Sequence, residues 1–210
     1  MRLRSAHVNA IARSALTAAV VVLLGSCLNV ETHIDLDADY SGRVTVSYEI
    51  DTELWELGVF DSDTSIRAIP VSEADFRRTA RRVEGVELLG YTLTRGDSVT
   101  EVEARLSFSD LDALNGIYAP GESLITIEEQ DGNRIYIQRL RTGEESAVRD
   151  REFLEEYFSG YDAVFTLTAP SEIRSSSTGE VLDDGVTARL SLDIMEFLTV
   201  TEPLAWEIHY

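Results

Sequence analysis

The chain has 210 residues, a length typical of one domain, and its 38 acidic residues outnumber 18 basic ones to give a formal net charge of −20 at pH 7. So large an acidic excess argues against a nucleic-acid-binding protein and against docking on anionic lipid through charge, because both need basic patches. We expect the excess to reflect the background composition of a salt-adapted or GC-rich bacterium, in which salt screens the repulsion between the acids. A dedicated cation-binding surface is an alternative.

Residues 1–26 have the composition of an export signal. Three arginines and no acid precede an almost wholly apolar run over residues 15–25. A transmembrane helix needs about 20 apolar residues, so this shorter run predicts a secretory signal peptide that is removed from the mature protein.

The next four residues, Leu24, Gly25, Ser26 and Cys27, match the lipobox of bacterial lipoproteins. Small residues before the cysteine let the lipoprotein signal peptidase cut between Ser26 and Cys27. The thiol then carries a diacylglyceryl group, and the new α-amino group takes an acyl chain such as palmitate. One acyl chain alone holds a protein only marginally, whereas two or three give stable anchoring. A buried structural cysteine and an ordinary cleaved signal are the alternatives.

Residues 27–210 are therefore expected to form a single exported domain, anchored to a membrane through Cys27. In enterobacterial lipoproteins, an aspartate directly after the lipidated cysteine resembles an inner-membrane retention signal. This chain has Leu28 at that position. This favours the outer membrane, with the domain facing the periplasm or the cell surface.

After the anchor, apolar and polar residues alternate with the period of half-buried strands. The pattern predicts three hairpins, with turns at residues 37–42, at 95–98 and at Asp131-Gly132. Further strands are expected at residues 163–170, 186–194 and 204–210, separated by the segments 171–180 and 197–203.

Helices are expected at fewer places. Ser72 followed by Asp75 predicts a capping box that opens a helix over residues 72–85. Shorter helices are expected at 109–116, with Ser109 as the cap, and at 150–160, while residues 51–71 form a short helix or a covering loop. The fold class is α+β: a mainly antiparallel, curved sheet of about seven to nine strands, with two or three helices on one face.

No residue pattern indicates a catalytic, metal or cofactor site, so an enzyme is not expected. The spacing that starts at Asp35 fails the EF-hand pattern, which needs glycine and glutamate where Tyr40 and Val46 stand. His33 and His209 would meet only if the first and last strands paired. A hydrolase that uses a carboxylate pair is the remaining catalytic alternative.

The order of these segments resembles the LppM-like domain of bacterial lipoproteins. The resemblance rests on the lipobox cysteine, "VETHIDLDADYSGRVTVSYEI", "SEADFRRTARRVEGVELLGYT", "FSDLDAL" and "FTLTAPSEIRSSSTGEVLDDGVTARLSLDI". It implies an exposed envelope domain without catalytic residues, for which lipid or glycolipid binding has been proposed. Such proteins often carry a C-terminal transmembrane helix, and "LAWEIHY" does not resemble one, so the lipid on Cys27 is expected to be the sole anchor.

Two functions follow as expectations. The first is binding of a lipid-like or hydrophobic ligand in a cavity under the curved sheet, since such cavities often hold ligands. The alternative is a structural or assembly lipoprotein that contacts envelope proteins through its acidic surface.

Overall fold

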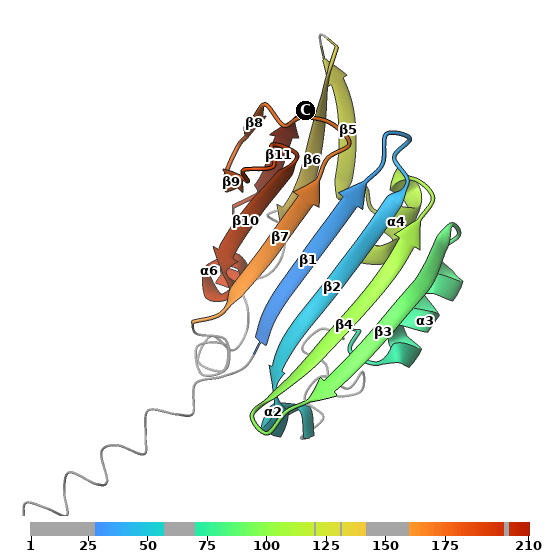
Figure 1. Cartoon of the computed structure of the whole chain (residues 1–210), viewed down its shortest axis with the longest axis vertical. Helices are drawn as coiled ribbons and strands as arrows, with labels where there is room; N and C mark the ends of the chain where they lie inside the picture. Colours follow the sequence, from blue (N-terminus) through green and yellow to red (C-terminus); the bar gives the residue numbers. More distant parts are fainter. Residues whose placement is uncertain (1–27, 57–69, 120, 131, 142–159, 200–201) are drawn as a thin grey trace, which may run out of the picture.

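The computed structural model describes residues 28–56, 70–119, 121–130, 132–141, 160–199 and 202–210. Figure 1 shows two β-sheets and short helices, with the strands of the larger sheet lying side by side across the molecule. Within the described ranges, no helix has the length and apolar content needed to cross a bilayer.

The larger sheet has seven strands in the order β3-β4-β2-β1-β7-β10-β9. β1 and β7 run parallel, and the other neighbours in this sheet are antiparallel. The strands are β1 (Leu28–Leu36), β2 (Gly42–Asp51), β3 (Val86–Arg95), β4 (Val99–Phe108), β7 (Asp162–Thr168), β9 (Glu180–Val181) and β10 (Thr187–Asp193).

The smaller sheet has four strands in the order β5-β6-β11-β8, and its described pairings are antiparallel. It consists of β5 (Ile125–Gln130), β6 (Asn133–Arg141), β8 (Ser175–Ser176) and β11 (Leu204–His209). Gln130 pairs with Asn133, so β5 and β6 are joined by a two-residue turn in which Gly132 has φ +79°. That left-handed conformation suits glycine because it has no Cβ.

The described helices are α2 (Thr52–Glu56), α3 (Glu73–Arg82), α4 (Leu111–Tyr118) and α6 (Ile194–Thr199). The expected capping box is confirmed at α3, where Ser72 and Asp75 satisfy each other's backbone N–H groups. At α4 the cap is Asp110, whose Oδ1 accepts from the Ala113 N–H at 2.8 Å, and the expectation that Ser109 caps this helix is wrong. A carboxylate is as good a helix cap as a hydroxyl.

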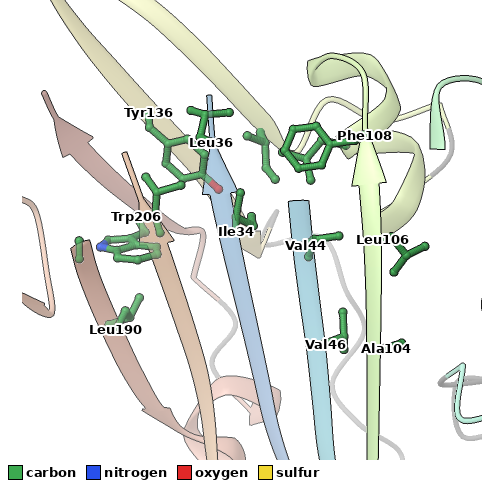
Figure 2. Packing of buried hydrophobic residues seen from close by; sticks show 14 of the residues in the cluster. Ile34, Leu36, Val44, Val46, Ala104, Leu106, Phe108, Tyr136, Leu190 and Trp206 are labelled. Carbon is green, nitrogen blue, oxygen red and sulfur yellow. The ribbon is translucent and has the colours of Figure 1, made fainter. Parts of the chain in front are cut away.

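One face of the larger sheet, the inner face, is covered by two different layers. α3 and α4 pack on β3 and β4 at one side. On the other side, Tyr136 of β6 and Trp206 of β11 point toward the larger sheet and lie beside Ile34 and Leu190, as Figure 2 shows. Both aromatic side chains are fully buried, so the interior between the two sheets is filled at this point.

The sequence pattern predicted most of this fold, and the α+β class is confirmed. The structure has more strands than expected, in two sheets instead of one. The segments expected to be separators contain β8, the first residue of β9 and the last three residues of α6. Residues 150–159 of the helix expected at 150–160 lie outside the described residues, so this helix stays a prediction.

Candidate functional site

The predicted attachment residues Leu24, Gly25, Ser26 and Cys27 lie outside the described residues, so lipidation of Cys27 stays a prediction. The described chain begins directly after them, in the first residue of a strand. Leu28 pairs with Ile50 of β2, so no linker separates β1 from position 27. A lipid on Cys27 would therefore hold the end of the sheet at which β1 begins.

The opposite face of the larger sheet, the outer face, is polar. Along β2 the burial alternates, with Val44, Val46 and Tyr48 pointing inward and Arg43, Thr45, Ser47 and Glu49 outward. β4 repeats this alternation, with exposed Glu101, Glu103 and Arg105 on the outer face. Alternating burial is the property of a sheet with one covered face and one open face.

A groove of about 210 Å³ lies on this outer face across β2, β4 and β3. It is lined by three carboxylates and three hydroxyls: Ser47, Glu49, Thr92, Thr94, Glu101 and Glu103, with Tyr48 and Val102 beneath. The described lining contains no arginine. The groove is therefore an anionic strip that also offers hydroxyl hydrogen-bonding groups.

The strand register places two negative charges side by side in this groove, and their repulsion destabilises the sheet. Glu49 and Glu101 are direct cross-strand partners, and like charges in that position destabilise a sheet. Compensation is partial: Asn29 donates to Glu49 Oε2 at 2.8 Å, and Arg105 Nε lies 3.4 Å from Glu103 Oε1. A cation bound across Glu49 and Glu101 would relieve the repulsion.

A second hollow of about 690 Å³ lies between the turn that follows α3 and the start of α4. Its charged lining comes from Arg82, Glu84, Asp110 and Asp112, and the rest comes from three glycines together with Val83, Ser109 and Ala113. Asp110 is occupied as a helix cap, because its carboxylate accepts from Ala113 and Ser109, and these bonds lower its pKa. This hollow is an open surface groove.

The two histidines of the predicted mature chain are not brought together. His33 lies on β1 and His209 on β11, which belong to different sheets, so the suggested pairing of first and last strands is wrong. His33 Nε2 is 2.9 Å from Thr168 Oγ1 and 3.3 Å from Asp35 Oδ1. No group of three metal-ligating side chains is found among the described residues.

Two aspartates, Asp39 and Asp184, accept hydrogen bonds within their own turns. Asp39 accepts from both the backbone and the hydroxyl of Ser41, bonds that lower the pKa of its carboxyl group. Asp184 accepts from the backbone of Val186 and from Thr187, with the same effect on its pKa. A carboxylate engaged by its own turn has fewer lone pairs left for a ligand.

Sequence reasoning missed the groove because it depends on strand register. The exposed positions of β2 and β4 were recognisable from their alternation. The pairing of Glu49 with Glu101 determines which of these exposed positions face each other. A single sequence does not contain that register.

Comparison with known proteins shows a similarity of fold. No protein-family model and no curated protein matches the chain. Among solved structures, the chain is similar to the folded domain of LppM from Mycobacterium tuberculosis, covering 90% of this chain and 92% of that one, with 12% identity and a TM-score of 0.47. A two-domain M1 zinc metallopeptidase bound to L-tryptophan matches with a TM-score of 0.24 and 13% identity, and the match spans 43% of that protein. The likeness to the LppM domain agrees with the resemblance expected from the sequence, and at this identity and TM-score it says nothing about what the chain binds.

Proposed function

We propose that the chain is a non-catalytic lipoprotein of the bacterial cell envelope, anchored through Cys27, whose domain binds a basic protein partner on the outer face of its larger sheet. The observation that carries the proposal is the anionic groove around Glu49 and Glu101. It lies on an open sheet face, and its two opposed carboxylates lack a cationic partner among the described residues of the groove.

The anchor is supported by the lipobox and by the start of β1 at Leu28. Exposed acids also surround the end of the sheet that this anchor would hold, including Glu53, Asp97 and Asp162. Anionic head groups repel such side chains. The domain would therefore be attached by its acyl chains and not by charge, which leaves the outer face open to partners.

The chemistry of the groove defines the partner. Carboxylates bind arginine and lysine side chains through charge-assisted hydrogen bonds, and the threonine and serine hydroxyls accept or donate further bonds. An exposed site of this kind is screened by salt, so binding is expected to weaken as ionic strength rises.

A lipid-like or hydrophobic ligand is the second candidate. Sites for such ligands are mostly apolar hollows of about 300–1,000 Å³. The two hollows described above are open grooves with charged linings, and the interior around Tyr136 and Trp206 is filled. The described residues therefore support the outer face better, and native mass spectrometry of the gently purified chain tests the alternative by its co-purifying lipids.

The proposed binding is tested with an arginine-rich peptide of about nine residues and a charge-matched pair of variants. The first variant carries Glu49→Gln, Glu101→Gln and Glu103→Gln, and the control carries Glu128→Gln, Glu202→Gln and Glu207→Gln at exposed positions elsewhere. Both remove the same formal charge.

Fluorescence anisotropy at low salt should show affinity falling about tenfold or more in the groove variant, which corresponds to about 1.4 kcal/mol. The control should stay within about twofold of the unmodified chain. Equal losses in both variants would mean that net charge alone attracts the peptide, and the proposal would fail.

A further inference from the structure

The exposed large hydrophobic side chains of the described residues lie at the two opposite edges of the larger sheet. They are Leu89, 53% exposed, and Leu93, 36% exposed, on β3, and Val181, 38% exposed, and Leu182, 36% exposed, on and next to β9. β3 and β9 are the terminal strands of that sheet. Edge strands leave backbone N–H and C=O groups unpaired, and exposed apolar side chains there mark a contact surface.

The register places Leu89 and the apolar patch at the β9 edge at the same level of the sheet. Starting from Val181, the cross-strand partners run through Ala188, Leu167, Ile34, Val44 and Leu106 to Leu88. Leu88 directly precedes the exposed Leu89, which occupies an irregularity in the β3–β4 register. Leu89 therefore lies level with the apolar patch at the β9 edge, whereas Leu93 pairs with Val102 and lies further along β3.

The two edges also differ in charge. Residues 70–95, which contain α3 and β3, hold five arginines against four acids, whereas residues 171–186 around β9 hold four acids and one arginine. The basic last turn of α3, with Arg81 and Arg82, is joined to the start of β3 by three residues. Figure 1 shows α3 beside β3 at that edge, on the side of the sheet away from β9. In a chain of net charge −20, this is an unusual concentration of positive charge.

Strand direction fits an edge-to-edge contact as well. Following the pairings across the sheet, β3 runs opposite to β9. A second copy placed beside the first in the same orientation would thus bring its β3 antiparallel to the first copy's β9. Antiparallel addition of a strand to a free edge is a common mode of recognition.

We propose that copies of this chain associate head to tail, the β3 edge of one copy adding to the β9 edge of the next. Leu89 then contacts Val181 and Leu182 of the neighbouring copy, while Arg81 and Arg82 face its Glu180 and Asp183. The contact is heterologous, because it uses two different surfaces, so each pair leaves one edge of each kind free for further copies. It depends neither on the anchor at Cys27 nor on a partner at the outer face.

β9 contributes only Glu180 and Val181 to its ladder. Such a short strand limits how many backbone bonds can form and protects the edge from uncontrolled growth. We therefore expect a weak, reversible contact that acyl anchoring in one membrane would favour by raising the local concentration.

Site-directed disulfide formation tests the contact in the full-length chain with Cys27→Ser, purified in mild detergent. Leu89→Cys and Val181→Cys are introduced into separate chains, so each chain holds one thiol. A disulfide needs Cβ atoms at about 3.5–4.5 Å. Mild oxidation should give a dimer when the two chains are mixed, and neither chain should form one alone. Val181→Cys mixed with Ala205→Cys, an exposed position on β11, is the control and should remain monomeric.

A second measurement tests the charge complementarity. Sedimentation of the full-length chain should show self-association that weakens about tenfold or more with Leu89→Glu and less with Leu89→Lys, because the β9 edge is acidic. Dimers formed by Leu89→Cys alone would indicate symmetric β3 pairing and overturn the head-to-tail contact. A chain that stays monomeric at all concentrations, with no disulfide in the mixture, would overturn self-association altogether.

Discussion

Replacing Asn115 by leucine should destabilise the protein, because this buried amide joins α4 to the smaller sheet. Asn115 is 6% exposed, and its Oδ1 accepts from the Ile125 N–H at 2.7 Å. Its Nδ2 donates to the Ile125 carbonyl at 2.8 Å and to the Leu111 carbonyl at 2.9 Å. The side chain thus satisfies both backbone groups of Ile125, which is itself 1% exposed.

The size of the effect follows from those two backbone groups. A buried polar group left without a partner costs about 1–3 kcal/mol, so two cost about 2–6 kcal/mol. Burial of a leucine side chain offsets about 1.5–3 kcal/mol of this. The middles of these two ranges leave a net loss of about 2 kcal/mol in the free energy of unfolding, or a fall in Tm of about 4–8 °C for a domain of this size.

Urea denaturation followed by circular dichroism measures this loss. Gln130→Leu, an exposed amide at the end of the same strand β5, is the control and should change stability by no more than about 0.5 kcal/mol. A loss below about 1 kcal/mol for Asn115→Leu would refute the reasoning, because it would show that Ile125 does not depend on this amide.

Three further predictions concern the fold. Trp206→Ala should cost about 3–5 kcal/mol in a denaturant titration, because the side chain is fully buried between the sheets; a loss under about 1 kcal/mol would contradict that packing. Gly42→Ala should lower Tm clearly, since an added Cβ would lie 2.0 Å from the Asp35 carbonyl oxygen, and an unchanged Tm would show that the β1–β2 turn has room. Asp184 is bonded by Thr187 and its pKa is lowered below 3.8, so the stability it contributes is present above pH 3.8 and is lost as pH falls through its folded pKa. Asp184→Asn should therefore lose less stability than the unmodified chain between about pH 5 and pH 2 in urea titrations, and equal losses would argue against this linkage.

The longer strands of the larger sheet could be predicted because one of their faces is buried. In β2, inward Val44, Val46 and Ile50 alternate with outward polar residues, and that period of two is visible in the sequence. α3 could be predicted equally well, because Ser72 and Asp75 form a local capping box that needs no tertiary context.

The division into two sheets could not be predicted. β1 pairs with β7 in parallel, joining Val30 to Ala163, and no local pattern contains a contact between residues so far apart in the chain. β8 and β9 have two residues each, too few for a periodic pattern. Short strands of this kind form because a neighbouring strand offers free backbone groups, and no sequence window contains that information.

The candidate sites depend on register to different degrees. The anionic groove needs the pairing of Glu49 with Glu101, and the head-to-tail contact needs Val181 to lie level with Leu88. The lipobox, by contrast, is four contiguous residues ending at Cys27, so its recognition needs neither strand register nor any long-range contact.

The mass of the N-terminal peptide from membranes of a bacterium that produces the full chain tests the central claim most directly. We predict that this peptide begins at Cys27 and carries a diacylglyceryl group with an additional acyl chain, and that Cys27→Ser abolishes both the cleavage and the modification. A peptide that retains residues 1–26, or one that begins at another residue with an unmodified Cys27, would contradict the claim that the domain is held at the membrane through this cysteine.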